Sequence, residues 1–223
     1  MYEAKFNPLA LQQMTMLKTQ SLSFRYPNGP AFEFPDMDLE SEKAILVLGK
    51  SGKGKTTLLH LLAGLLDPIS GSVTVGNVNL ASLSGRKRDE YRGQNIGLIF
   101  QVAQFVKSIS VMQNLQLART FSGLDTDVDF ANQLLDELGI KDKGSSRPSQ
   151  LSVGERQRAG IARALITRPK LVLADEPTSA LDDDNCHGVA EILEKTVVGH
   201  GAALVVVTHD QRLKDRIKNS VEI

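Results

Sequence analysis

The sequence predicts an α/β fold with a mostly parallel sheet. Three short segments are apolar at every position, which is typical of parallel strands that are buried on both faces. They are residues 44–48, 171–174 and 204–207. A helical pattern follows each of these segments. The first is marked by Leu58, Leu61, Leu62 and Leu65, and the other two are residues 185–197 and 210–218. Strands that alternate with helices in this way favour a parallel sheet.

Shorter strands are predicted around this core. Residues 17–24 alternate in part between apolar and polar side chains, and the turn-forming run 27–30 (Pro-Asn-Gly-Pro) follows them. Residues 72–75 and 96–100 are further segments with the composition of strands. We therefore expect several short strands near the N-terminus and two more after the first helix.

The middle of the chain has a different pattern. From residue 109 to about 140, leucine and alanine recur at helical spacing on both sides of a polar loop at 123–127. The sequence therefore predicts that a helical insertion, at roughly residues 102–165, interrupts the α/β core.

Composition excludes several classes of protein. The chain has 223 residues with 26 basic and 26 acidic side chains, so its formal net charge is zero, which argues against bulk attraction to nucleic acid or to an anionic membrane. The longest apolar runs, 44–48 and 202–207, fall far below the ~20 residues of a membrane-spanning helix. A single cysteine, Cys186, indicates a reducing compartment. We expect a cytosolic protein, and any membrane process would need another chain.

A glycine-rich segment joins the first apolar strand to the first helix. Its sequence, Gly49-Lys50-Ser51-Gly52-Lys53-Gly54-Lys55-Thr56, fits the pattern G-x-x-x-x-G-K-[ST]. The backbone N–H groups of such a loop, together with the dipole of the following helix, bind phosphate. Lys55 would contact the β- and γ-phosphates, Thr56 would bind Mg²⁺, and Thr57 would lie beside them. The alternatives are a glycine-rich turn that binds nothing and, for Lys50 and Lys53, solvated loop lysines.

Two adjacent acids end the second apolar strand. Asp175 occupies the position where a sheet of this kind holds Mg²⁺, usually through water, and Glu176 would point toward the γ-phosphate and polarise an attacking water. The alternative is a helix cap or an exposed turn.

A third motif lies between these two sites. It is Leu151-Ser152-Val153-Gly154-Glu155-Arg156-Gln157-Arg158, and it closely resembles the signature motif of ATP-binding cassette (ABC) ATPases. The other landmarks of that family also match. They are Tyr26 where an aromatic ring stacks on adenine, the Q-loop residue Gln101, the D-loop Ser179-Ala180-Leu181-Asp182, and the switch residue His209.

This resemblance implies a fold and a domain plan. It implies a P-loop NTPase with a RecA-like core, an N-terminal antiparallel β-subdomain and a helical subdomain. The single ABC ATPase domain would span residues 16–218, with residues 1–15 as an N-terminal extension. The implied ligands are ATP and Mg²⁺, with Thr56, Gln101 and Asp175 as the residues that hold the metal.

The resemblance also implies a mechanism in which two copies pair head to tail. Each ATP would lie between the phosphate loop of one copy and the Ser152 hydroxyl and Gly154 N–H of the other, with Asp182 nearby. Glu176 would act as general base, and His209 would bind the γ-phosphate and the water. Gln101 would report the nucleotide state to the helical insertion.

The implied partners are a second cassette and an integral membrane permease, with no nucleic acid, at the cytoplasmic face of the membrane. The segments at 147–158 and 173–178 resemble the lipoprotein-releasing and macrolide-exporter group, which suggests export or extraction of a lipoprotein, lipid or drug-like cargo. Alternatives are a force-transmitting cassette that regulates an envelope enzyme, and a soluble ABC ATPase acting on DNA or ribosomes. Val153 replaces the first glycine of the signature, so altered closure of the pair is expected.

Overall fold

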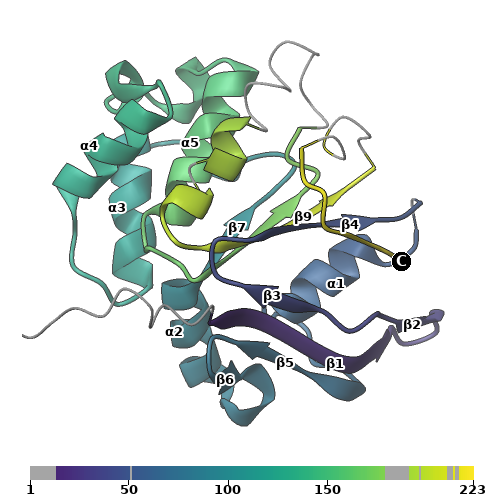
Figure 1. Ribbon diagram of the computed structural model, residues 1–223. Coiled ribbons are helices and arrows are strands. Elements are labelled where there is room, and N and C mark those ends of the chain that lie inside the picture. The colour runs from purple at the N-terminus through teal and green to yellow at the C-terminus, as the bar shows by residue number, and fades with distance from the viewer. Residues whose placement is uncertain (1–13, 51, 179–190, 196, 210–212, 214–215) are drawn as a thin grey trace, which may run out of the picture.

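The described part of the chain contains two β-sheets, with helices packed against them (Figure 1). The computed structural model describes residues 14–223, apart from residues 51, 179–190, 196, 210–212 and 214–215. Among the described residues, the strand pairs are parallel in one sheet and antiparallel in the other. The α/β class, the parallel core and the antiparallel subdomain that the sequence predicts are therefore confirmed.

The parallel sheet brings the ends of three strands to one edge. Its strand order is β10-β4-β9-β8-β7. The strands are β4 (Ala44–Leu48), β7 (Ile96–Ile99), β8 (Leu171–Asp175), β9 (Ala203–Thr208) and β10 (Ser220–Glu222). The register pairs Leu48 with Thr208 and Asp175 with Val207. The segments that follow β4, β8 and β9 therefore start side by side.

The last strand follows residue 218, where the sequence predicts that the domain ends. β10 lies beyond that residue and pairs in parallel with β4, with Val221 opposite Val47. The sequence Ser-Val-Glu contains one apolar residue, so it lacks the continuous apolar pattern by which the other strands of this sheet are found. Among the described residues β10 is the outermost strand of this sheet and its side chains are exposed or half-buried, so it needs no continuous apolar run.

The antiparallel sheet is built around one long strand. β1 (Thr15–Arg25) pairs with β2 (Ala31–Glu33), β3 (Asp38–Glu40) and β5 (Ser70–Val75), and β5 pairs in turn with β6 (Val78–Asn79). The turn predicted at 27–30 joins β1 to β2. This hairpin places two aromatic side chains close to the glycine-rich loop, as described below.

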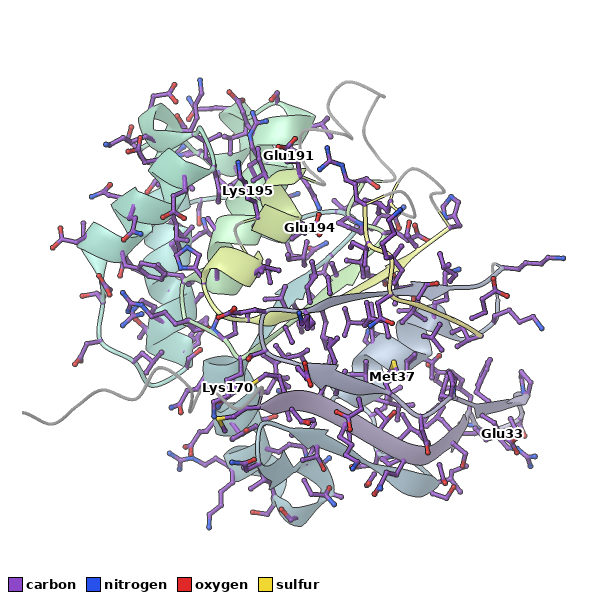
Figure 2. All side chains as sticks on the ribbon, viewed as in Figure 1. Glu33, Met37, Lys170, Glu191, Glu194 and Lys195 are labelled. Atoms are coloured by element: carbon purple, nitrogen blue, oxygen red, sulfur yellow. The ribbon has the colours of Figure 1, made fainter. Side chains whose placement is uncertain are left out.

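Helix α1 (Lys55–Leu62) lies between the two sheets. Its leucines pack in one apolar core with residues from both sheets, among them Val75 of the antiparallel sheet and Val205 of the parallel one. Met37, labelled in Figure 2, is 4% exposed and belongs to the same core. The glycine-rich loop thus leads into a helix that is held from both sides.

The helix ends earlier than the leucine spacing predicts. Gly64 adopts φ +64°, and Leu65 N–H donates to the carbonyl of His60 at 2.8 Å while Gly64 N–H donates to that of Leu61 at 3.0 Å. These two bonds close a left-handed helix cap, in which glycine is strongly favoured. Leu65 is consequently 45% exposed and lies outside the helix.

The helical insertion packs on the other face of the parallel sheet (Figure 1). It contains α3 (Val111–Phe121), α4 (Val128–Glu137) and α5 (Val153–Leu165), and α2 (Gly85–Asn95) precedes β7. Short 3₁₀ turns occur at Leu80–Ser82, Lys141–Lys143 and Pro148–Gln150. The predicted helices at 185–197 and 210–218 lie largely outside the described residues. Within the described residues, the helices are all too short or too polar to cross a membrane.

Candidate active site

The segments that follow β4, β7 and β8 line a cavity of about 330 Å³ at the carboxyl edge of the parallel sheet. Ligand sites in open α/β sheets form at this edge, because loops of variable sequence meet there on a rigid support. The lining residues come from both the loops and the antiparallel sheet, and they are Phe32, Gly52, Gly54, Lys55, Thr56, Thr57, Gln101, Asp175 and Glu176. Eight of these nine residues are polar or are glycines of the phosphate loop, and all eight belong to the site predicted from the sequence; Phe32 is the ninth.

The glycine-rich loop has the backbone that phosphate binding requires. Gly52 and Gly54 adopt φ of +81° and +91°, in the left-handed region that glycine tolerates without strain. Gly54 is the N-cap of α1 and supplies no side-chain acceptor to the first N–H groups of the helix. Those groups, with the positive end of the helix dipole, are therefore free to bind an anion. Ser51 lies outside the described residues.

Lys55 is folded back over the loop. Its Nζ donates to the carbonyl of Gly49 at 2.8 Å and to that of Lys50 at 3.4 Å, and its side chain is 11% exposed. Gly49 in turn has no room for a side chain, since a Cβ there would lie 2.8 Å from the carbonyl oxygen of Ile223. The ammonium group is thus held at the mouth of the loop, where it can reach a phosphate by a rotation of its side chain.

Thr56 and Asp175 form the part of the site that suits a metal. The Thr56 hydroxyl donates to Asp175 Oδ2 at 3.1 Å, although the two residues are far apart in sequence. Burial raises the pKa of the Asp175 carboxyl above its usual value, against the lowering effect of the Thr56 hydrogen bond, and the neighbouring Glu176 raises it further. A hydroxyl, a carboxylate and the amide of Gln101 are oxygen ligands of the kind that Mg²⁺ takes. A divalent cation would also offset the cost of the partly buried Asp175 charge.

Glu176 is held by the strand next to its own. Its Oε2 accepts hydrogen bonds from the Thr208 hydroxyl at 3.0 Å and from the His209 N–H at 3.3 Å. Its Oε1 lies 2.7 Å from His209 Nδ1 and 4.0 Å from Lys55 Nζ. The carboxylate is 13% exposed and the imidazole 70% exposed. β8 and β9 therefore place an oriented carboxylate at the wall of the cavity, with the histidine on its solvent side.

The backbone of Glu176 is also unusual. Its φ is +45°, a left-handed value that costs a residue other than glycine about 1–2 kcal/mol. Its N–H donates to the carbonyl of Val207 at 2.8 Å, which continues the pairing of β8 with β9 by one residue. This turn separates Asp175 from Glu176, so that one contacts Thr56 and the other contacts His209.

The aromatic contacts differ in part from those expected. Tyr26 lies at the start of the β1–β2 turn, is 40% exposed, and its hydroxyl is 3.2 Å from the Thr57 hydroxyl. Phe32, which sequence reasoning did not single out, lines the cavity instead. Its signal in the sequence is weak, because an aromatic residue in a short strand beside Phe34 is first explained as core. Strand pairing alone brings it to the glycine-rich loop.

Ser152 starts the signature helix α5 and caps it. Glu155 N–H donates to Ser152 Oγ at 3.2 Å, and Ser152 N–H donates to the Glu155 carboxylate at 2.8 Å. This reciprocal capping box satisfies two of the N–H groups at the helix start, while the N–H groups of Val153 and Gly154 have no acceptor in the preceding turn of the helix. Ser152 and Gly154 do not contribute to the lining of the cavity among the described residues. The predicted D-loop residue Asp182 lies outside the part of the chain that the structure describes.

Fold and site together define a P-loop nucleotide-binding protein with a helical insertion. The model of the family described as ABC transporter matches residues 33–179. The chain belongs to the ABC transporter family, as an ATP-binding cassette, and it is an ATPase of that family.

Relatives and solved structures agree with this assignment. The chain is 36% identical over 209 residues to the lipoprotein-releasing system ATP-binding protein LolD of Legionella pneumophila (strain Lens), covering 91% of this chain and 92% of that protein. It is 35% identical to the LolD of Xanthomonas euvesicatoria pv. vesicatoria (strain 85-10), covering 95% and 89% of the two chains.

Among solved structures, the dimeric post-hydrolysis state of the ATP-binding cassette MJ0796 with ADP and Pi is similar at a TM-score of 0.82 and 26% identity, over 93% of this chain and 94% of that one. CbiO1 from Clostridium perfringens, part of the ABC transporter complex cbiONQ, has a TM-score of 0.78 at 26% identity, over 88% and 79% of the two chains.

Proposed function

We propose that this cassette binds Mg²⁺–ATP in the 330 Å³ cavity and that a second copy completes each site. The phosphate loop and Lys55 bind the triphosphate, and Tyr26 stacks on the base. Thr56, Asp175 and Gln101 hold Mg²⁺, which would neutralise charge on the β- and γ-phosphates. Lys50 and Lys53 add positive charge near the phosphates, although neither side chain lines the cavity.

Glu176 is the general base of the proposed reaction. Its hydrogen bonds to Thr208 and His209 fix the carboxylate so that one oxygen can accept a proton from a water aligned with the γ-phosphate. Lys55, 4.0 Å from Glu176, stabilises the negative charge of the carboxylate and of the phosphate together. His209, on the solvent side of Glu176, orients the water and donates to the γ-phosphate.

The two-copy arrangement is supported by one observation: within one chain, the groups that can bind phosphate lie in two separate places. The phosphate loop, Asp175 and Glu176 line one cavity, whereas the first residues of α5, with their N–H groups, do not line it. A helix start with a polar cap binds phosphate well. A symmetric pair of cassettes, with the α5 start of one copy over the phosphate loop of the other, uses both features at each of two equivalent sites.

Mixing two inactive variants tests this arrangement. Lys55→Ala removes the phosphate lysine of its own copy, and Ser152→Ala removes the signature hydroxyl that the copy offers to its partner. Each variant alone should have lost most of its ATPase activity. An equal mixture contains mixed pairs in which one site is intact, so about a quarter of the wild-type rate should return. A mixture as inactive as its components, with pairing shown by chromatography, would contradict the proposal.

We also propose that a membrane permease binds the groove between the helical insertion and the core. This groove has a volume of about 460 Å³ and is lined from α2, β7, α3, α5 and the segment after Gln101. Its position suits a partner that responds to the nucleotide, because Gln101 lies in the cavity and its neighbours lie in the groove. The names of the relatives favour a lipoprotein as the extracted cargo. The cassette would then lie at the cytoplasmic face of the membrane through its permease.

A further inference from the structure

The β1–β2 hairpin contacts the phosphate loop through the aromatic pair Tyr26 and Phe32. Tyr26 follows β1 directly and Phe32 is the middle residue of β2. Their ring centroids are 6.5 Å apart at an interplanar angle of 87°. Figure 1 shows β2 and the N-terminal end of α1 on the same side of the molecule. The antiparallel sheet thus reaches the loop that binds phosphate.

Phe32 packs against the backbone of the loop. A Cβ added to Gly54 would lie 2.6 Å from Cδ1 and 3.0 Å from Cε1 of the Phe32 ring. The ring therefore covers Gly54 closely, at the residue where the chain turns through φ +91° into α1. The Phe34 ring stacks on the Phe32 ring, with their centroids 6.2 Å apart and their planes 9° from parallel. A shift of Gly54 away from its turn would open a gap beneath a partly buried ring.

Tyr26 holds the other side of the same turn. Its hydroxyl is 3.2 Å from the hydroxyl of Thr57, which is 6% exposed in the first turn of α1. Phe24 packs on the Tyr26 ring edge-to-face with centroids 4.7 Å apart, so the tyrosine is itself held in place. Gly54 and Thr57 enclose the N–H groups that a phosphate would use, and each is contacted by one member of the aromatic pair.

The phosphate loop needs contacts from outside it, because the interactions within the loop disfavour the conformation that binds phosphate. Several N–H dipoles point toward one place and repel each other when no anion is there. A loop that must be ordered at the moment of binding loses affinity, whereas a loop ordered beforehand does not. Contacts with the aromatic pair add stability to the ordered shape without taking up the N–H groups.

We propose that Tyr26 and Phe32 are positioning residues that hold the phosphate loop in its anion-binding shape before nucleotide arrives. This inference rests on the proposed binding of ATP at the cavity. It assigns to the two rings a contribution to triphosphate affinity that does not depend on the base. Stacking on adenine is a separate contribution, which a ligand without a base cannot report.

Calorimetric titrations with tripolyphosphate and with ATP test the proposal on the full chain. The variants are Phe32→Ala, Phe32→Leu and Tyr26→Phe, with Glu33→Ala as the matched control. Glu33 is the exposed next residue of β2 and is labelled in Figure 2. Tyr26→Phe keeps the ring for stacking and loses only the hydroxyl. Melting temperatures of all variants show whether each one is folded.

The expected result is a common loss for both ligands. Tyr26→Phe should weaken tripolyphosphate and ATP by the same factor, about threefold to tenfold for one hydrogen bond. Phe32→Ala should weaken both at least as much, Phe32→Leu should recover part of the loss, and Glu33→Ala should bind as wild type. If Phe32→Ala does not fold, the leucine and Tyr26→Phe variants give the answer.

Two outcomes would overturn the inference, and they differ from each other. Wild-type tripolyphosphate affinity in Tyr26→Phe and Phe32→Leu, with any loss confined to ATP, would mean that the rings act on the base alone. The proposed binding of ATP would then stand. Failure of the unaltered protein to bind either ligand would instead remove the proposed function and this inference together.

Discussion

Asp175 and Glu176 show how adjacent residues take different roles. They are consecutive, yet Asp175 accepts a hydrogen bond from Thr56 while Glu176 contacts Thr208 and His209. The left-handed φ of Glu176 turns the chain between them. Both features reduce stability, one through a partly buried carboxylate and the other through backbone strain. Sites that bind charged ligands commonly hold such unfavourable features, since the ligand offsets them.

Removal of the Asp175 charge should therefore stabilise the protein without ligand. The folded state raises the pKa of Asp175 above that of the unfolded chain, mainly through burial, so ionisation of this group opposes folding. The cost is absent below the unfolded-state pKa of about 3.9 and grows as the pH rises through the folded-state value. Asp175→Asn should melt at a higher temperature than wild type at pH 7, by about 2–4 °C for each kcal/mol gained.

The same variant should lose Mg²⁺-dependent ATP hydrolysis, which calorimetric melting and an ATPase assay together would show. The difference in melting temperature should shrink as the pH falls toward 4. Glu33→Gln removes an exposed carboxylate and should change neither property. A lower melting temperature for Asp175→Asn at neutral pH would contradict the inference that the partly buried charge of Asp175 opposes folding.

At the scale of elements, the start of α5 combines a structural and a proposed binding role. The capping box of Ser152 and Glu155 stabilises the helix, and Lys143, 3.4 Å from the Glu155 carboxylate, supports it. Hydrogen bonds with Ser152 lower the pKa of the Glu155 carboxyl, so it stays ionised. Val153, 56% exposed at the first helical position, leaves the cap intact. The glycine that is usual there in the family is therefore not needed for the helix to start.

Two substitutions of Ser152 separate these roles. Ser152→Ala should lose the cap and reduce the free energy of unfolding by about 1 kcal/mol, whereas Ser152→Asp keeps an acceptor at the N-cap and should keep stability. Both should lose ATPase activity, because alanine lacks the hydroxyl and aspartate brings a negative charge toward the γ-phosphate of the partner. Chemical denaturation and ATPase rates are the measurements.

Full activity of Ser152→Asp would contradict the proposed contact across the pair. Equal loss of stability in both variants would contradict the capping role. The affinity of the monomeric cassette for ATP, measured by calorimetry, should be the same in wild type and in both variants, because the monomer binds ATP through its own phosphate loop.

At the scale of the whole molecule, the helical insertion forms one wall of the groove proposed for the permease. Phe121, the last residue of α3, lines this groove and is 81% exposed. Val106 lies in the same groove and is 45% exposed. An exposed aromatic side chain beside a groove is a frequent anchor of protein–protein binding. The segment from Gln101 to Val106 connects the two sites, because Gln101 lines the nucleotide cavity and Val106 lines the groove. A movement of this segment can therefore change the shape of both sites together.

Phe121→Ser should disconnect the cassette from its permease without altering its own chemistry. The loss of an aromatic anchor should weaken permease binding by roughly tenfold or more, while the ATPase rate and melting temperature of the isolated cassette stay unchanged. Ile69→Ser, which alters an apolar residue 67% exposed outside the groove, is the matched control. Binding is measured with the permease in detergent or nanodiscs. Equal binding of Phe121→Ser and wild type would remove the groove as the docking site.

The residues of the site are predictable from sequence where their spacing along the chain is itself the requirement. The phosphate loop needs glycines, a lysine and a threonine in consecutive positions between a strand and a helix, so Gly52, Gly54, Lys55 and Thr56 could be named from that run. Asp175 and Glu176 follow from the apolar strand before them. The α/β class follows from the same apolar runs, because burial on both faces leaves no polar alternation.

The tertiary structure decided the contacts between segments, because these depend on strand register and packing rather than on local sequence. Pairing of β8 with β9 places His209 and Thr208 at Glu176, and pairing of β10 with β4 completes the sheet beyond residue 218. Pairing of β1 with β2 brings Phe32 to Gly54, a contact that no local pattern indicates. Sequence alone identified the groups that we propose to act on the phosphates. The fold determined which side chains hold those groups in place.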